Sequence, residues 1–212
     1  METPRDLDVR YEVSRLDADA LGSDPIEAFG RWFAEAWEAG VREPHAMALA
    51  TVSADGWPSS RMVLLKGHDA RGFCFYTNFE SRKGRELEQT PRAALTFWWG
   101  ALERQVRIEG GVERVEDGTA DAYFESRPVD SRISAWASPQ SEVVPDRAAL
   151  ELRVAEVEAR FAGSPIPRPP FWGGFRVVPR RIEFWQGRPG RTHDRVAFER
   201  AGAQWQRSRL AP

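Results

Sequence analysis

The chain has 212 residues, 42% hydrophobic and 29% charged, which is the composition of a globular protein with a sizeable core. Thirty Lys and Arg residues against 32 Asp and Glu residues give a formal net charge of −2. This balance excludes a bulk positive field that would recruit nucleic acid or anionic lipid, so any anion site must be local.

The N-terminal third contains the first predicted helix. Residues 1–23 show no sustained periodicity and are predicted to form a flexible N-terminal arm. Asp24 and Pro25 are typical of a helix start, and apolar residues then recur at spacings of three and four until Gly40, which predicts an amphipathic helix. Further helices are predicted over residues 81–90, 117–127 and 145–161, the first of them ending before Pro91.

Apolar runs rich in β-formers, separated by turn residues, predict short antiparallel strands joined by hairpins. These strands cover residues 46–52, 61–65, 73–77, 93–99, 105–115, 175–178, 182–185, 196–200 and 205–210. Many strands with few crossover helices indicate a mainly β fold, an antiparallel barrel with peripheral helices. Residues 24–212 are predicted to form a single domain, in which the proline-rich residues 165–170 are a stiff connector.

Several classes of protein are excluded by missing motifs. The sequence has no glycine-rich dinucleotide fingerprint, no phosphate-loop sequence, no His-Glu-x-x-His and no Gly-x-Ser-x-Gly nucleophile elbow. Cys74 has no second cysteine to pair with, and the three histidines are far apart, so we predict no disulfide and no metal site. No membrane span or signal peptide is recognised, and a reducing cytoplasm is the expected compartment.

Basic residues form local clusters that could bind anions. Ser81-Arg82-Lys83 opens a helix directly after a strand, so backbone N–H groups and two cations could converge on one phosphate. The alternative is a capped helix whose cations face water. Arg61 and Lys66 flank an apolar run, and their odd separation of five predicts opposite faces of a regular strand. Either residue could instead serve only solubility.

A second possible phosphate site follows the helix predicted at residues 117–127. Tyr123 and Arg127 are four residues apart and share a helical face, and Pro128 forces the chain out of the helix before Ser131. A phenol, a guanidinium and a hydroxyl could then surround one anion. The alternative is that Tyr123 packs in the core while Arg127 is exposed.

A third basic cluster lies near the C-terminus. Arg191, His193 and Arg195 alternate, so a strand would point all three side chains to one face. Three potential cations on one face repel each other unless an anion or carboxylates lie opposite, which favours a ligand site.

Taken together and in order, these motifs resemble the pyridoxine/pyridoxamine 5'-phosphate oxidase family over most of residues 24–212. The segments that carry the resemblance are residues 61–66, 75–78, 81–83, 102–106, 126–131, 138–141, 171–176, 182–187 and 191–195. The resemblance implies a split β-barrel homodimer with two FMN sites at the subunit interface. It also implies oxidation of pyridoxamine or pyridoxine 5'-phosphate to pyridoxal 5'-phosphate, with oxygen reduced to hydrogen peroxide.

The resemblance assigns roles to residues of this chain. The implied flavin contacts are Arg61, Lys66, Tyr76, Thr77, Arg82, Lys83, Gln105, Gln140, Ser141, Trp185 and Arg195. The implied substrate contacts are Lys66, Tyr123, Arg127, Ser131, Arg191, His193 and Tyr11. Of these, Arg191 and His193 are the implied catalytic residues, with Arg191 against the reacting ring and His193 at a ring substituent or at the phosphate region. Near the N-terminus the family has an Arg three residues before the lid tyrosine. Here that position holds Asp8, and Arg10 is the nearest replacement.

Two other functions remain open at this point, and a third is disfavoured. One is a related flavin oxidase of the same barrel that acts on a phenazine precursor, for which the cluster of Lys66, Arg127 and Ser131 would have no phosphate to bind. Another is a non-catalytic flavin-binding or haem-binding module, which would retain the phosphate cradle alone. A nucleic-acid-binding barrel that uses the nine tryptophans is disfavoured because no basic stripe is present.

Overall fold

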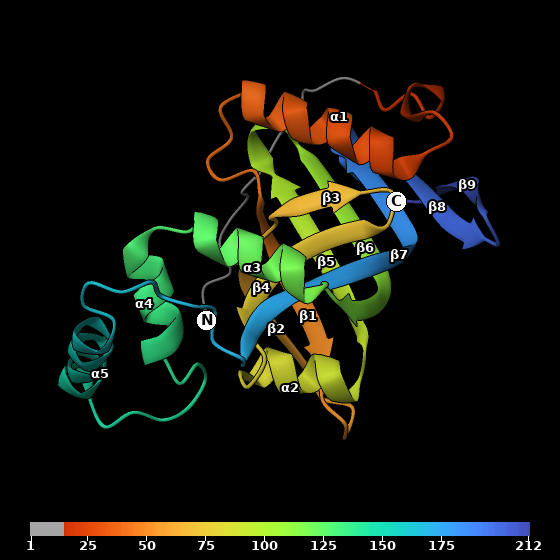
Figure 1. The fold of residues 1–212 in the computed structure, drawn as a ribbon. Helices are drawn as coiled ribbons and strands as arrows, with labels where there is room; N and C mark the ends of the chain where they lie inside the picture. Colours follow the sequence, from red (N-terminus) through yellow and green to blue (C-terminus); the bar gives the residue numbers. More distant parts are fainter. Residues whose placement is uncertain (1–14) are drawn as a thin grey trace, which may run out of the picture. The chain divides into compact units, whose positions relative to one another are not determined.

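We describe residues 15–212 of the protein from a computed structural model (Figure 1). The helices are α1 (Pro25–Glu38), α2 (Arg82–Gln89), α3 (Asp117–Ser126), α4 (Val129–Ala137) and α5 (Arg147–Arg160), with short 3-10 helices at Asp19–Leu21, Gly100–Leu102 and Pro189–Arg191. Among these described residues, no helix has the length and apolar content needed to cross a membrane.

The strands are β1 (Ala46–Val52), β2 (Pro58–Leu64), β3 (Gly67–Asp69), β4 (Gly72–Asn78), β5 (Arg92–Trp99), β6 (Arg104–Arg114), β7 (Trp172–Gln186), β8 (Asp194–Ala201) and β9 (Gln204–Leu210). Within residues 15–212 they form one sheet in the order β2-β1-β5-β6-β7-β4-β3, and β8 pairs with both β7 and β9. The prediction of a mainly β, antiparallel fold with peripheral helices is confirmed.

One local prediction was wrong, and two elements were not predicted. The two strands predicted over residues 175–178 and 182–185 are one strand, β7, which runs through Pro179 because both halves find partners, β4 for the first and β8 for the second. The sequence reading also missed β3, which pairs with β4 across the turn after Asp69. Finally, the segment after Pro128 forms a helix of its own, α4, because a proline is tolerated at a helix start.

The described chain divides into two compact units that interleave in sequence. The first contains residues 15–47, 95–109 and 179–212, and the second contains residues 48–94 and 110–178. In the first unit, α1 begins at Asp24, whose Oδ1 accepts a 2.7 Å hydrogen bond from the Ile26 N–H. Its apolar face packs on the sheet, with the Phe29 ring centroid 5.0 Å from that of Phe97 and Trp32 edge-on to Phe184 at 5.0 Å.

The second unit holds α2 and the helices α3, α4 and α5, of which α4 and α5 lie side by side (Figure 1). Its helical core consists of Phe124, Ile133, Ile166 and Trp172, all buried. At this core β4 and β7 pair antiparallel with Tyr76 opposite Gly174, where a Cβ on the glycine would lie 2.8 Å from Tyr76 Cε1. Glycine there lets the Tyr76 ring lie across the neighbouring strand.

Candidate active site

The start of α2 has the geometry of an anion cradle. Ser81 caps the helix, and its Oγ accepts a 3.3 Å hydrogen bond from the Gly84 N–H while donating one of 2.7 Å to the Asn78 carbonyl oxygen. Gly84 is required here, because a Cβ would lie 2.1 Å from the Phe79 carbonyl oxygen. The Ser81 cap and Gly84 together fix the first turn of α2 against the end of β4. The backbone positions of Arg82 and Lys83 in this turn are thereby fixed as well.

Lys83 is held at this helix start by oxygen atoms. Its Nζ donates to Thr77 Oγ1 at 2.9 Å, to Gln140 Oε1 at 2.7 Å and to Ser81 Oγ at 3.3 Å. Burial, with a smaller effect from the charge of Arg61, lowers the pKa of Lys83 to about 8. A buried ammonium whose hydrogen-bond partners are all neutral is stabilised by an added anion.

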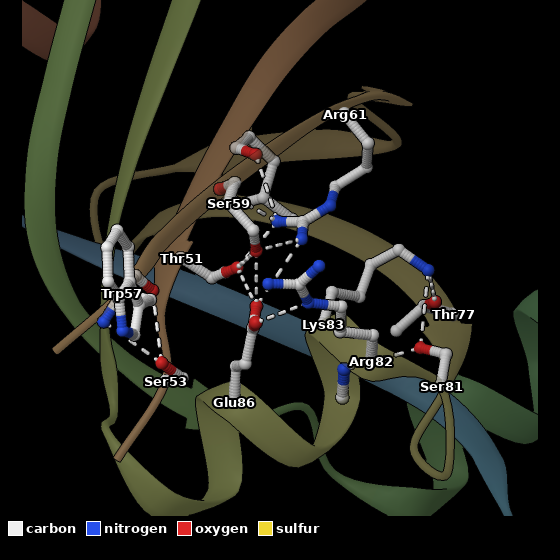
Figure 2. Close-up of polar contacts among 12 residues, drawn as sticks. Thr51, Ser53, Trp57, Ser59, Arg61, Thr77, Ser81, Arg82, Lys83 and Glu86 are labelled. Carbon is white, nitrogen blue, oxygen red and sulfur yellow. Dashed lines mark hydrogen bonds and ion pairs between the residues drawn. The ribbon is translucent and has the colours of Figure 1, made fainter. Parts of the chain in front are cut away.

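Arg61 and Arg82 meet at one buried carboxylate, Glu86 (Figure 2). Arg61 donates from Nη2 to Glu86 Oε2 at 3.3 Å, and Arg82 donates from Nε to Glu86 Oε1 at 2.9 Å. The hydroxyls of Thr51 and Ser59 donate to the same Oε2 at 2.5 and 2.6 Å. Although burial opposes it, these hydrogen bonds lower the pKa of Glu86 to about 2, so the carboxylate is ionised.

A stack of aromatic rings forms a second part of the site within the same unit. The Tyr76 and Tyr123 ring centroids are 4.0 Å apart, and Trp172 stacks on Tyr76 at 5.5 Å and on Tyr123 at 6.1 Å. Arg127 places its guanidinium 4.7 Å from the Trp172 ring centroid. Tyr123 and Arg127 therefore meet on Trp172, although Arg127 lies just past the end of α3 in an extended conformation rather than on a shared helical face.

One nitrogen of the Arg127 guanidinium makes no hydrogen bond to any described residue. Its Nη1 is buried and has no hydrogen-bond partner among the described residues 15–212. Burial lowers the pKa of Arg127, and only the nearby Tyr123 opposes that shift. Ser131, which the sequence placed near this arginine, lies in the first turn of α4, where backbone N–H groups have no intrahelical acceptor. An unpaired buried guanidinium donor is costly, which identifies this position as a candidate anion site.

Arg168 ties the elements of this aromatic site together, and the sequence reading missed it. It donates from Nη1 to the Trp172 carbonyl oxygen at 2.7 Å, and from Nε and Nη2 to Asp121 and Asp117 of α3 at 2.6 and 2.8 Å. The helix that carries Tyr123 is thereby fixed to the strand that carries Trp172. No local pattern indicates this contact, because the two carboxylates and the arginine are about fifty residues apart in sequence.

In the other unit, His193 and Trp185 form a ring pair. Their ring centroids are 4.5 Å apart, and the Arg188 N–H donates to His193 Nδ1 at 3.1 Å. Burial, and then the charge of Arg191, lower the pKa of His193. With Nδ1 accepting a hydrogen bond, the proton of the neutral ring resides on Nε2, which can donate to a ligand.

The predicted alternation of Arg191, His193 and Arg195 on one strand was wrong. β8 begins only at Asp194, and Arg191 ends a 3-10 turn with a left-handed φ of 60°. Arg195 is the one member of the three on the strand, where its Nε donates to Glu183 Oε1 at 2.8 Å. Glu183 thus supplies the carboxylate expected opposite a cluster of cations. Its hydrogen bond with Arg195 raises the pKa of Arg195.

The remaining predicted residues are placed as follows. Lys66 is exposed and lies beyond the end of β2, so the prediction that it continues one regular strand with Arg61 was wrong. The Lys66 N–H instead donates to the Cys74 carbonyl oxygen of β4, which starts the β3-β4 pairing. Gln105 lies on β6 and is half-buried, and Ser141 has a left-handed φ of 75°. Tyr11, Asp8 and Arg10 lie outside the described residues.

The candidate residues therefore fall into two groups. The second unit holds Arg61, Lys66, Tyr76, Thr77, Arg82, Lys83, Gln140, Ser141, Tyr123, Arg127 and Ser131, and the first unit holds Gln105, Trp185, Arg191, His193 and Arg195. The structure brings Thr77, Lys83 and Gln140 together, and separately Tyr76, Tyr123 and Arg127.

Comparison with known proteins settles the family. The profile of the family described as pyridoxamine 5'-phosphate oxidase matches residues 33–161, and that of the pyridoxine 5'-phosphate oxidase C-terminal dimerisation region matches residues 172–212. The chain belongs to the pyridoxamine 5'-phosphate oxidase family. The members of this family are oxidoreductases, and residues 172–212 of the chain match the family's dimerisation region.

Individual family members are close in sequence. The chain is 57% identical to the pyridoxine/pyridoxamine 5'-phosphate oxidase of Rubrobacter xylanophilus, over 98% of this chain and 97% of that protein. It is 56% identical to the protein of the same name from Thermosynechococcus vestitus, over 98% of each chain.

Two solved structures share the fold. PhzG from Burkholderia lata 383, in complex with tetrahydrophenazine-1-carboxylic acid, matches with a TM-score of 0.88 and 38% identity, over 94% of this chain and 99% of that one. A pyridoxamine 5'-phosphate oxidase-related, FMN-binding protein from Nostoc punctiforme matches with a TM-score of 0.69 and 19% identity, over 86% of this chain and 96% of that one. The split-barrel fold predicted from the sequence is confirmed.

Proposed function

We propose that the protein is an FMN-dependent oxidase that converts pyridoxamine 5'-phosphate, pyridoxine 5'-phosphate or both to pyridoxal 5'-phosphate, with oxygen as electron acceptor. The observation that carries this proposal is that one unit contains two separate cation sites. Lys83 and its neighbours form the first, and Arg127, whose Nη1 finds no partner in the described part of the chain, forms the second. A phosphorylated cofactor and a phosphorylated substrate require two such sites.

The donors at α2 fit the phosphate of FMN. A capped helix start, two cations and a glycine-dependent close turn are features of phosphate sites. Lys83, Arg82 and Arg61 would hold the phosphate, together with Thr77, and Tyr76 lies one residue away on β4. Bound FMN would accept a hydride equivalent from the carbon that bears the amine or alcohol of the substrate and pass the electrons to oxygen.

The chain's own residues would bind and orient the substrate. Arg127, Tyr123 and Ser131 would hold its phosphate, with Lys66 as an exposed additional cation. His193 would donate from Nε2 to a substituent of the substrate ring, and Arg191 would stabilise negative charge that develops there. Gln105, Gln140, Ser141, Trp185 and Arg195 would complete the flavin site.

We also propose a homodimer. The family's dimerisation region in residues 172–212 supports it, as does the apolar side-chain surface of the edge strand β2, where Met62 and Leu64 are 64% and 37% exposed. Trp98, 53% exposed in the other unit, is a further apolar side chain of the kind that interfaces cover.

A related oxidase acting on a phenazine precursor is the second candidate. The likeness to PhzG favours it, since that structure was solved with a phenazine-type acid. Such a substrate carries a carboxylate and no phosphate, so it would not require the additional contacts of Ser131 and Lys66 at the anion site.

Anaerobic reduction of the flavin separates the two candidates. The purified, FMN-loaded protein is mixed without oxygen with pyridoxamine 5'-phosphate, with unphosphorylated pyridoxamine, or with tetrahydrophenazine-1-carboxylic acid. We expect rapid loss of the yellow flavin absorbance with the phosphorylated amine only. Bleaching by the phenazine acid alone would contradict the proposed substrate, and no bleaching by any of them would contradict an oxidase.

A further inference from the structure

Glu86 is an unusual residue to find at a phosphate cradle. Its side chain is 6% exposed and lies between Arg61 and Arg82, both predicted to contact the phosphate. By Coulomb's law alone, a buried carboxylate beside an anion site weakens anion binding. We therefore expect Glu86 to favour anion binding in another way, by more than this repulsion opposes it.

Two hydroxyls lie between Arg61 and Glu86 and contact both of them (Figure 2). Thr51 Oγ1 accepts from Arg61 Nη1 at 2.5 Å and donates to Glu86 Oε2 at 2.5 Å. Ser59 Oγ accepts from Arg61 Nη2 at 2.5 Å and donates to the same Oε2 at 2.6 Å. Each hydroxyl gives its single proton to Glu86 while its oxygen accepts from Arg61, so the two hydroxyls link the carboxylate to the arginine.

The other carboxylate oxygen orients Arg82. Glu86 Oε1 accepts from Arg82 Nε at 2.9 Å, and among the described residues this is the one hydrogen bond that the Arg82 guanidinium makes. The terminal nitrogens of Arg82 remain for an external acceptor. Glu86 therefore holds Arg61 through two hydroxyls and orients Arg82 by accepting from the Arg82 Nε–H.

We propose that Glu86 is the positioning residue of the phosphate cradle, and that it fixes Arg61 and Arg82 in the directions that distinguish FMN from riboflavin. This inference rests on the proposed function, because it takes FMN as the ligand. Glu86 itself contacts no phosphate in this arrangement. It acts through the two arginines, and its negative charge offsets their mutual repulsion before the cofactor binds.

Substitution Glu86→Gln tests the arrangement without changing the size of the side chain. An amide presents an N–H₂ group in place of one oxygen. That group faces either the two hydroxyls, whose protons then lose their shared acceptor and must turn away from residue 86, or the Arg82 Nε–H, which then loses its acceptor. Simple electrostatics predicts the opposite outcome for this variant, namely tighter FMN binding after loss of a negative charge.

The measurement is the dissociation constant of the apoprotein for FMN and for riboflavin, from quenching of flavin fluorescence. For Glu86→Gln we expect FMN to bind at least fivefold more weakly while riboflavin affinity changes less than twofold. Glu88→Gln is the matched control on the same helix, since Glu88 pairs with Arg114 through an exposed ion pair, and both affinities should change less than twofold.

Three results would overturn the inference. FMN binding by Glu86→Gln that is unchanged or tighter would show that the carboxylate only repels the phosphate. Equal weakening of FMN and riboflavin would show a general structural role. A wild-type apoprotein that does not prefer FMN to riboflavin would contradict the proposed cofactor and the inference together. If the wild type prefers FMN and Glu86→Gln keeps the same preference, only the inference is contradicted.

A second variant decides the case if Glu86→Gln does not fold. Ser59→Ala keeps the carboxylate but removes one hydroxyl that links it to Arg61. We expect a twofold to fivefold loss of the preference for FMN over riboflavin. An unchanged preference in a folded Ser59→Ala protein would overturn the inference.

Discussion

The two cation sites of the second unit differ in how the protein balances their charge. At α2, Arg61 and Arg82 share a buried carboxylate, and Lys83 is surrounded by three oxygen acceptors. At the aromatic stack, Arg127 rests on the face of Trp172, and its buried Nη1 has no hydrogen-bond partner within residues 15–212.

This difference suggests different demands on the two sites. Charges that the protein already balances keep their geometry without a ligand, as a tightly held cofactor requires. A guanidinium supported mainly by aromatic rings has an unmet hydrogen bond, so an arriving anion gains the full benefit of pairing with it. A substrate that must bind and leave in each cycle suits the second arrangement.

The largest expected effect is at the α2 cradle. Lys83→Ala removes a charge-assisted contact worth about 1.5 to 3 kcal/mol, so FMN should bind about ten to more than a hundred times more weakly. Riboflavin, which lacks the phosphate, should bind with nearly unchanged affinity. Fluorescence titration of the apoprotein measures both constants.

Arg85→Ala is the control for that experiment. Arg85 lies on the same helix but is exposed and pairs with Glu142, so its loss should leave both affinities near wild type. Equal weakening of FMN and riboflavin by Lys83→Ala would show that Lys83 does not recognise the phosphate.

The next effect concerns the aromatic site. Arg127→Ala should raise the Michaelis constant for pyridoxamine 5'-phosphate at least tenfold, because a charge-assisted contact of about 1.5 to 3 kcal/mol is lost. FMN content should stay near wild type, since the cofactor phosphate is assigned to the other site. Steady-state kinetics and the flavin absorbance of the purified variant give both quantities.

A matched arginine tests whether stacking alone explains the result. Arg160 lies 4.8 Å from the Trp136 ring centroid in the same unit and has no proposed ligand. Arg160→Ala should therefore leave the Michaelis constant unchanged. If Arg127→Ala instead strips the flavin from the protein, the division between cofactor and substrate sites is wrong.

The smallest effect is a pH dependence of cofactor binding. In the free protein, burial lowers the pKa of Lys83 to about 8, whereas the bound phosphate favours the protonated ammonium. Binding above about pH 8 must therefore take up a proton, and FMN affinity should be about tenfold lower at pH 9 than at pH 7.

Lys83→Arg is the control for this pH dependence, because a guanidinium stays protonated throughout this range. Its FMN affinity should be nearly constant between pH 7 and pH 9. A wild-type profile that is equally flat would contradict the assignment of the titrating group to Lys83.

Local sequence signals predicted the helix starts and the residues of the cradle. Asp24 and Ser81 cap α1 and α2 as predicted, because a cap needs only a side-chain oxygen and the backbone N–H groups two or three residues later. The spacing of Arg82 and Glu86, four residues apart on a helix, could also have indicated their ion pair.

Contacts between distant segments were not predictable in this way. Trp172 became a platform for Tyr123 and Arg127 because β7 and α3 pack together, and no spacing in the sequence relates them. The alternation of Arg191, His193 and Arg195 suggested a strand, but the Pro189–Arg191 turn and the pairing of β8 with β7 start the strand at Asp194.

By itself, the sequence determined the fold class, the helix caps and which cations could serve each site, since these depend on periodicity and on contacts within one turn of helix. Only the tertiary structure decided which of those cations are balanced by the protein. Glu86 meets Arg61 directly and through hydroxyls on β1 and β2, and Arg127 meets an aromatic ring but no acceptor for Nη1 among the described residues. The physical reason is that hydrogen-bond satisfaction in a buried site depends on atoms that long-range packing brings together.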